Sequence, residues 1–138
     1  MRKASLKTIA KKMKGLDMCT MITQDGRNGL HARPMSNNGK VEYDGNSWFF
    51  SYDYSNKVKQ IKADKKVSLV YQGKNMLFIE CYGRASIVKD KKIMEEKWIK
   101  ELDMWFPKGI DTPGICLIKV SATRVHFWDK EEEGEFKS

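Results

Sequence analysis

Apolar residues recur with helical spacing in three segments of the chain. Residues 4–14 are predicted to form a helix that ends at Gly15, because the apolar residues of this segment share one helix face: Leu6, Ile9, Ala10 and Met13. Further helices are predicted over residues 55–63, where Ser55 is a suitable N-cap, and over residues 91–103. A single apolar face on each segment is typical of helices at the periphery of a domain.

Between these segments the pattern changes to the short apolar runs of β-strands. Turn residues such as Asp25-Gly26 and Asp44-Gly45-Asn46 separate neighbouring runs and favour hairpins. Gly83 lies inside the longest run and predicts a bend or bulge, as barrels need where a strand turns a corner. The predicted strands are residues 18–23, 30–36, 41–43, 47–51, 67–71, 76–88, 115–121 and 123–128. Short, evenly spaced strands with peripheral helices predict a mainly β fold, a small antiparallel barrel of about six to eight strands.

Length and composition fit one domain over residues 1–138. An aromatic content of 11% excludes a disordered chain. No run approaches the ~20 apolar residues of a membrane span, so no membrane association is expected. The three cysteines are far apart in the sequence, which argues against a disulfide framework and against a zinc site: Cys19, Cys81 and Cys116. We therefore expect a protein of the reducing cytoplasm.

The net charge of +8 is concentrated at one end of the chain. Residues 1–15 carry six Lys and Arg and no acid, whereas residues 129–138 form an acidic tail with five acids and two Lys. We interpret the lysines of the N-terminal helix as a solvated face. A helix that binds RNA or lipid is the less favoured alternative, because nucleic-acid-binding proteins more often spread basic residues among exposed aromatics.

One segment offers a candidate binding site. Residues 49–57 run from a strand into a helix start, and Ser51, Ser55, Asn56 and Lys57 place donors where the first N–H groups of a helix are unpaired. A helix N-terminus with a lysine is a suitable phosphate site. An ordinary capped helix with a surface lysine explains the same residues equally well. Neither histidine has metal-type spacing to cysteines or carboxylates, and no catalytic constellation stands out.

Three segments in order resemble a known family. They are His31 to Met35 (HARPM), Phe49 to Lys57 (FFSYDYSNK) and Val125 to Trp128 (VHFW). Their order and spacing, over roughly residues 17–128, resemble the FMN-binding split-barrel superfamily typified by pyridoxamine 5'-phosphate oxidase. The Arg-Pro-Met form and the run Trp105-Phe106-Pro107 resemble its general stress protein 26 branch.

The resemblance implies FMN as the cofactor and a homodimer with flavin sites at the subunit interface. The implied contacts are Arg33, Pro34 and Met35 on one strand, Phe50 and Ser51 on the next strand, and Asn56 and Lys57 at the following helix start. Trp105 would lie near the ring, and Trp128 would reach the flavin across the dimer interface. Asn56 stands where the family pattern has Arg, so the hold on the phosphate is expected to be weaker here.

The resemblance also implies flavin redox chemistry, and thus an oxidoreductase of unknown substrate. Two departures argue against vitamin B6 oxidase activity. Phe78 and Glu80 replace the Gln and Arg that the oxidases carry before the barrel-bend glycine, and the acidic tail is a poor partner for an anionic substrate. A non-catalytic flavin-binding stress protein that stores or senses FMN is the alternative.

Overall fold

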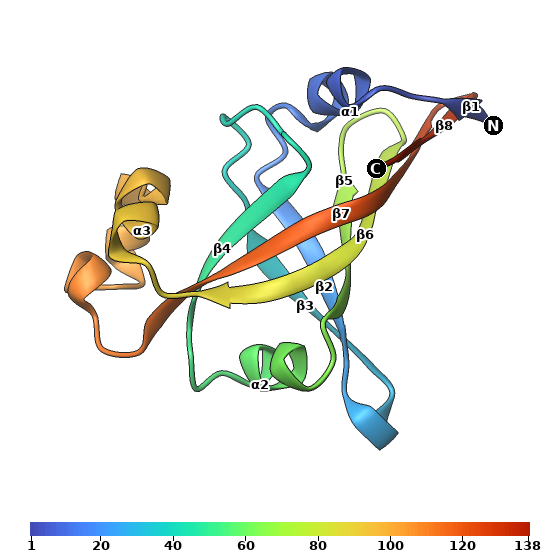
Figure 1. Cartoon of the computed structure of the whole chain (residues 1–138). Helices are drawn as coiled ribbons and strands as arrows, with labels where there is room; N and C mark the ends of the chain where they lie inside the picture. Colours follow the sequence, from blue (N-terminus) through green and yellow to red (C-terminus); the bar gives the residue numbers. More distant parts are fainter.

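The computed structural model describes residues 1–138 and shows a mainly β domain with helices at its periphery (Figure 1). The strands are β1 (Arg2–Lys3), β2 (Met18–Gln24), β3 (Leu30–Ser36), β4 (Asn46–Tyr52), β5 (Lys66–Gln72), β6 (Leu77–Val88), β7 (Ile115–Asp129) and β8 (Glu132–Lys137). The helices are α1 (Leu6–Met13), α2 (Asn56–Ala63) and α3 (Lys91–Lys97), with 3₁₀ segments at Gly26–Asn28, Lys100–Met104 and Gly109–Asp111. No helix is long and apolar enough to cross a membrane.

The strands form one sheet with the order β1-β8-β7-β6-β5-β2-β3, and β4 pairs with the first half of β7. All pairs are antiparallel except β1 with β8. β3 and β4 do not pair with each other, so the barrel is open between them. Figure 1 shows α1 and α2 at opposite ends of the barrel. Both helices bury their apolar faces in the main core, α1 through Ile9 and Met13, and α2 through Val58 and Ile61.

The bend predicted at Gly83 is confirmed. The register between β6 and β7 shifts between Tyr82 and Gly83, which marks a bulge. A Cβ atom on Gly83 would overlap the carbonyl oxygen of Ser121, so only glycine lets the two strands approach this closely.

Two strand predictions were wrong. Residues 41–43 form no strand, and β4 finds its partner 63 or more residues away on β7 instead of in a local hairpin. Tyr43 is drawn into the core, where its hydroxyl lies 3.6 Å from Cys81 Sγ, and this long-range packing overrides the local turn signal. The segments 115–121 and 123–128 are one continuous strand, because the bulge at the facing Gly83 absorbs the irregularity.

The helix predicted over residues 91–103 ends at Lys97. Trp98 has an extended backbone, and its ring packs edge-on against Phe50 at 5.1 Å, while its indole N–H donates to Asp103. These contacts turn the chain out of the helix and over the outer side of β4.

The acidic tail is not free in solution, because residues 132–137 form β8 beside β7. Lys12 donates to Asp129 at 2.7 Å and lies 4.6 Å above the Phe127 ring, and Arg2 forms an ion pair with Glu132. The solvated face predicted for the lysines of the first helix is therefore wrong for Lys12. Ion pairs between the basic N-terminal segment and the acidic C-terminal segment therefore neutralise part of the charge of each.

Candidate functional site

The predicted phosphate segment lies where β4 leads into α2. Ser51 is 4% exposed, faces inward, and lies opposite Cys116 of β7. Its hydroxyl is 3.2 Å from that of Ser55, the N-cap residue of α2. The Ser55 side chain accepts no hydrogen bond from the first turn. The N-terminal N–H groups of α2 therefore lack a side-chain cap and are available to an anion.

Arg33 reaches this end of the barrel from β3, the open edge strand. Its guanidinium donates to Thr23 Oγ1 at 2.8 Å, to Gln60 Oε1 at 2.8 Å and to the Met21 carbonyl oxygen at 3.3 Å. Gln60 Oε1 also accepts from Thr23 Oγ1 at 2.6 Å. These neutral groups fix the position of the guanidinium without cancelling its charge.

Lys57, in the first turn of α2, is the second cation of the site. Burial and then the charge of Arg33 lower the pKa of Lys57 from its usual value. Burial lowers the pKa of Arg33 as well, opposed by Asp25. Neither side chain forms an ion pair with an acid. Two half-buried, mutually repelling cations beside an uncapped helix N-terminus are an arrangement that a bound anion stabilises.

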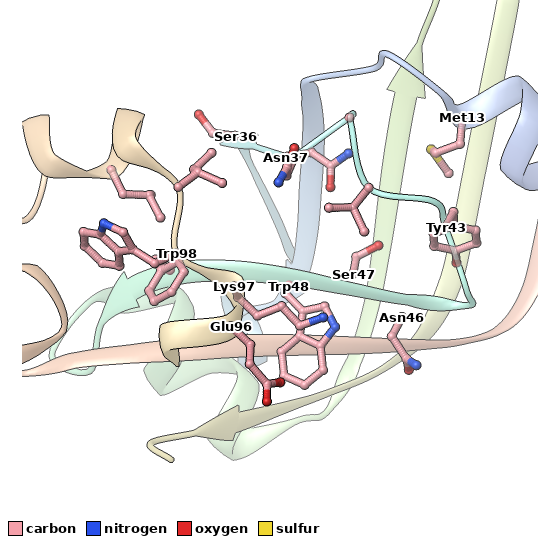
Figure 2. A pocket seen from close by; sticks show the side chains of 16 residues that line it. Met13, Ser36, Asn37, Tyr43, Asn46, Ser47, Trp48, Glu96, Lys97 and Trp98 are labelled. Carbon is pink, nitrogen blue, oxygen red and sulfur yellow. The ribbon is translucent and has the colours of Figure 1, made fainter. Parts of the chain in front are cut away.

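A cavity of about 280 Å³ lies between β4, the chain that follows β3 and the end of α3, and we call it the seam cavity. It begins at Phe50, the neighbour of Ser51, and extends past the end of β3 at Ser36 and Asn37. Figure 2 shows side chains of β4, of the chain after β3 and of the end of α3 around it, among them Trp48 and Trp98. Aromatic walls with a few amide and hydroxyl groups suit a flat, partly polar ring.

The structure brings Arg33, Ser51 and Lys57 together around the start of α2, and none of the three lines the seam cavity. Phe50 points to the opposite side of β4 from Ser51, as alternate strand residues must, and lines the seam cavity. Asn56, at the first position of α2, is exposed at the same helix start.

The other predicted site residues lie elsewhere. Met35 is buried in the core, whereas Pro34 is exposed on the outer face of β3, an edge strand where a missing N–H is tolerated. Trp105 is 65% exposed beyond the Lys100–Met104 turn and meets β4 only through its carbonyl oxygen, which accepts from the Tyr52 hydroxyl.

Trp128 lies near the far end of β7. Its ring stacks on that of His126 at 4.0 Å, and His126 Nε2 is 2.6 Å from Glu133. Twelve residues separate Trp128 from Cys116, the residue opposite Ser51, which corresponds to about 40 Å of extended strand. Within one chain this tryptophan and the Lys57 cluster are not brought together.

Sequence reasoning missed Thr23 and Gln60, the residues that position Arg33. Gln60 follows Lys57 by three positions and so shares its helix face, which is a usable signal. Thr23 is 1% exposed in a mostly apolar strand, and nothing in the local sequence distinguishes it from an ordinary strand threonine.

Comparisons with known proteins agree with this architecture. The family model described as pyridoxamine 5'-phosphate oxidase like matches residues 4–138. No curated protein matched the chain.

Three solved structures illustrate the likeness. A Clostridium acetobutylicum protein related to general stress protein 26 of B. subtilis has a TM-score of 0.80 and 17% identity, over 96% of this chain and 93% of that one. General stress protein 26 of Bacillus anthracis has a TM-score of 0.75 and 21% identity, over 88% and 92%. The general stress FMN/FAD binding protein of Xanthomonas citri has a TM-score of 0.78 and 20% identity, over 92% and 89%. These likenesses confirm the predicted mainly β split barrel.

Proposed function

The chain belongs to the pyridoxamine 5'-phosphate oxidase like family, and we propose that it binds FMN with the phosphate between Arg33 and Lys57. The observation that carries the proposal is the pair itself: two half-buried cations without an acid partner at an uncapped helix start. The X. citri protein of the same fold, described as FMN/FAD binding, supports a flavin as the ligand.

Each residue of the cluster has a part in holding the phosphate. Lys57 contributes a full charge, and the first N–H groups of α2 contribute directed donors. Arg33, held by Thr23 and Gln60, adds a second charge from β3. The Ser51 hydroxyl lies beside them and can donate to a phosphate oxygen.

The ring of the flavin is assigned to the seam cavity, along Phe50 and the tryptophans of its wall. A bound flavin would supply hydride or electron transfer, and the chain would bind, orient and shield the ring. We therefore propose a flavin-dependent oxidoreductase of unknown substrate. The proposed compartment is the cytoplasm, as expected from the cysteine pattern.

A non-catalytic role in storing or sensing FMN is the second candidate. The side chains hydrogen-bonded to Arg33 and Ser51 are hydroxyls and an amide, none of which is an effective general acid or base near neutral pH. Steady turnover of NADH or NADPH with any electron acceptor, at a rate above that of free FMN, would separate the enzyme from the storage protein.

The outer face of the sheet supports a homodimer as the assembly. Apolar side chains are exposed on the outer face of β2 and β3, where Met18 is 53% and Leu30 69% exposed. Trp128 is 40% exposed and lies on the same side of the sheet. The side follows from the cross-strand partners, since Trp128 lies opposite Phe78 and Phe78 lies opposite Gln72, which is level with Met18. A second copy seated on this face could bring its Trp128 to the flavin that the first copy holds.

Excess FMN is expected to raise the thermal midpoint of the flavin-free protein. A ligand that binds only the folded state at about 100 times its Kd adds roughly 2.7 kcal/mol. For a domain of this size that is a rise of roughly 5–10 °C. Differential scanning fluorimetry with and without FMN measures it, and an unchanged midpoint for folded, flavin-free protein would contradict the proposal.

A further inference from the structure

A second cavity, of about 300 Å³, lies between α1 and the chain that follows β3. Lys7 and Lys11 of α1 and the C-cap residue Lys14 line one side, and Lys40 lines the other. Glu42 is the only acid in the wall. We call this cavity the lysine groove.

Two lysines of the groove share one face of α1. Lys7 and Lys11 follow the i, i+4 spacing, which places like charges in adjacent turns and weakens an isolated helix, and Lys14 follows directly after the helix. None of the four groove lysines forms an ion pair, whereas Lys12, on another side of the same helix, is paired with Asp129 and Glu132. The fold thus neutralises one side of α1 and leaves the other positive and concave.

The lysine groove lies next to the seam cavity. Val41 lines both cavities, and the end of α1 contributes Met13 to the seam cavity and Lys14 to the groove. Val41 therefore forms a wall that the two cavities share.

We propose that the lysine groove binds the phosphate or diphosphate group of a second ligand. That this ligand is a second one, beside FMN, rests on the proposed function. The groove runs along α1 from Lys7 to its C-cap Lys14, about 10 Å, which suits a diphosphate better than a nucleic-acid strand. A volume near 300 Å³ is at the small end of ligand pockets.

Calorimetric titration with inorganic diphosphate, near physiological ionic strength, tests the groove. The variant Lys11→Gln/Lys14→Gln should bind diphosphate at least tenfold more weakly than the parent chain. The control Lys100→Gln/Lys108→Gln removes the same charge from exposed lysines outside both cavities, and should change the affinity less than twofold. Circular dichroism and thermal melting establish that both variants are folded.

Three results would overturn the proposal. The first is that the parent chain does not bind diphosphate, and the second is that the two double variants lose affinity for diphosphate equally. The third is that Lys57→Ala abolishes diphosphate binding while Lys11→Gln/Lys14→Gln retains it. The last result would assign the diphosphate to the flavin phosphate site. FMN binding should be unchanged in Lys11→Gln/Lys14→Gln. If neither the parent chain nor any variant binds FMN while diphosphate binding follows the pattern above, the proposed flavin is rejected and the lysine groove is retained.

Discussion

Lys57→Ala is expected to weaken FMN binding about tenfold to a hundredfold and riboflavin binding far less. The side chain is half-buried beside Arg33 with no acid partner, so it is available to the phosphate, which riboflavin lacks. A hydrogen bond to a charged group contributes roughly 1.5–3 kcal/mol, which corresponds to this range of affinity. Fluorescence titration of both flavins against both proteins measures the difference.

Lys59→Ala is the matched control for this substitution. It removes the same charge from the same helix, but the Lys59 side chain is exposed. The general field of the helix and its lysines changes equally in both variants. Equal losses for the two variants, or equal losses for FMN and riboflavin, would show that the phosphate binds elsewhere.

Met18→Asp is expected to convert the proposed homodimer into monomers at micromolar concentration. In a two-fold dimer each copy carries the new carboxylate, and a charge forced into an apolar interface costs several kcal/mol. Because Met18 is 53% exposed within one chain, the fold itself should be retained. Sedimentation velocity measures the change, and FMN affinity should fall with it because half of each flavin site is lost.

Met104→Asp makes the same chemical change at a methionine that is 79% exposed and lies beyond the outer face of the sheet. It should remain dimeric and keep its affinity for FMN. A parent chain that sediments as a monomer and still binds FMN tightly would contradict the shared site.

The parts of the fold that could be predicted are those set by local pattern. The apolar faces of the helices were read correctly, since Ile9 and Met13 in α1 and Val58 and Ile61 in α2 are buried. Gly83 identified the bulge because no other residue fits where two backbones meet this closely.

Long-range packing decided the rest. β4 pairs with β7. Residues 132–137 form β8 at the edge of the sheet, where Glu132 forms ion pairs with Arg2 and Lys12. The pairing of β4 leaves no local periodicity, because its partners are distant in the chain. β8 pairs with the adjacent β7 in a tight hairpin, but its charged residues hide the strand pattern. The break after Lys97 likewise depends on the contact of Trp98 with Phe50.

The candidate site divides in the same way. Ser51 and Lys57 could be predicted because a strand end, a helix start and a lysine are contiguous in the sequence. The hydrogen bonds from Arg33 to Thr23 and Gln60 form because β2, β3 and α2 meet at one end of the barrel, which the local sequence does not reveal. The part proposed for Trp128 depends on a second copy, which one chain does not reveal.

The most direct measurement is the flavin content of the purified protein. We expect protein purified from cells to absorb near 450 nm and, on denaturation, to release FMN at about one molecule per chain, identified by chromatography and mass. A colourless protein that takes up no FMN on incubation, although it is folded, would contradict the account, and release of riboflavin without FMN would contradict the phosphate site at Arg33 and Lys57.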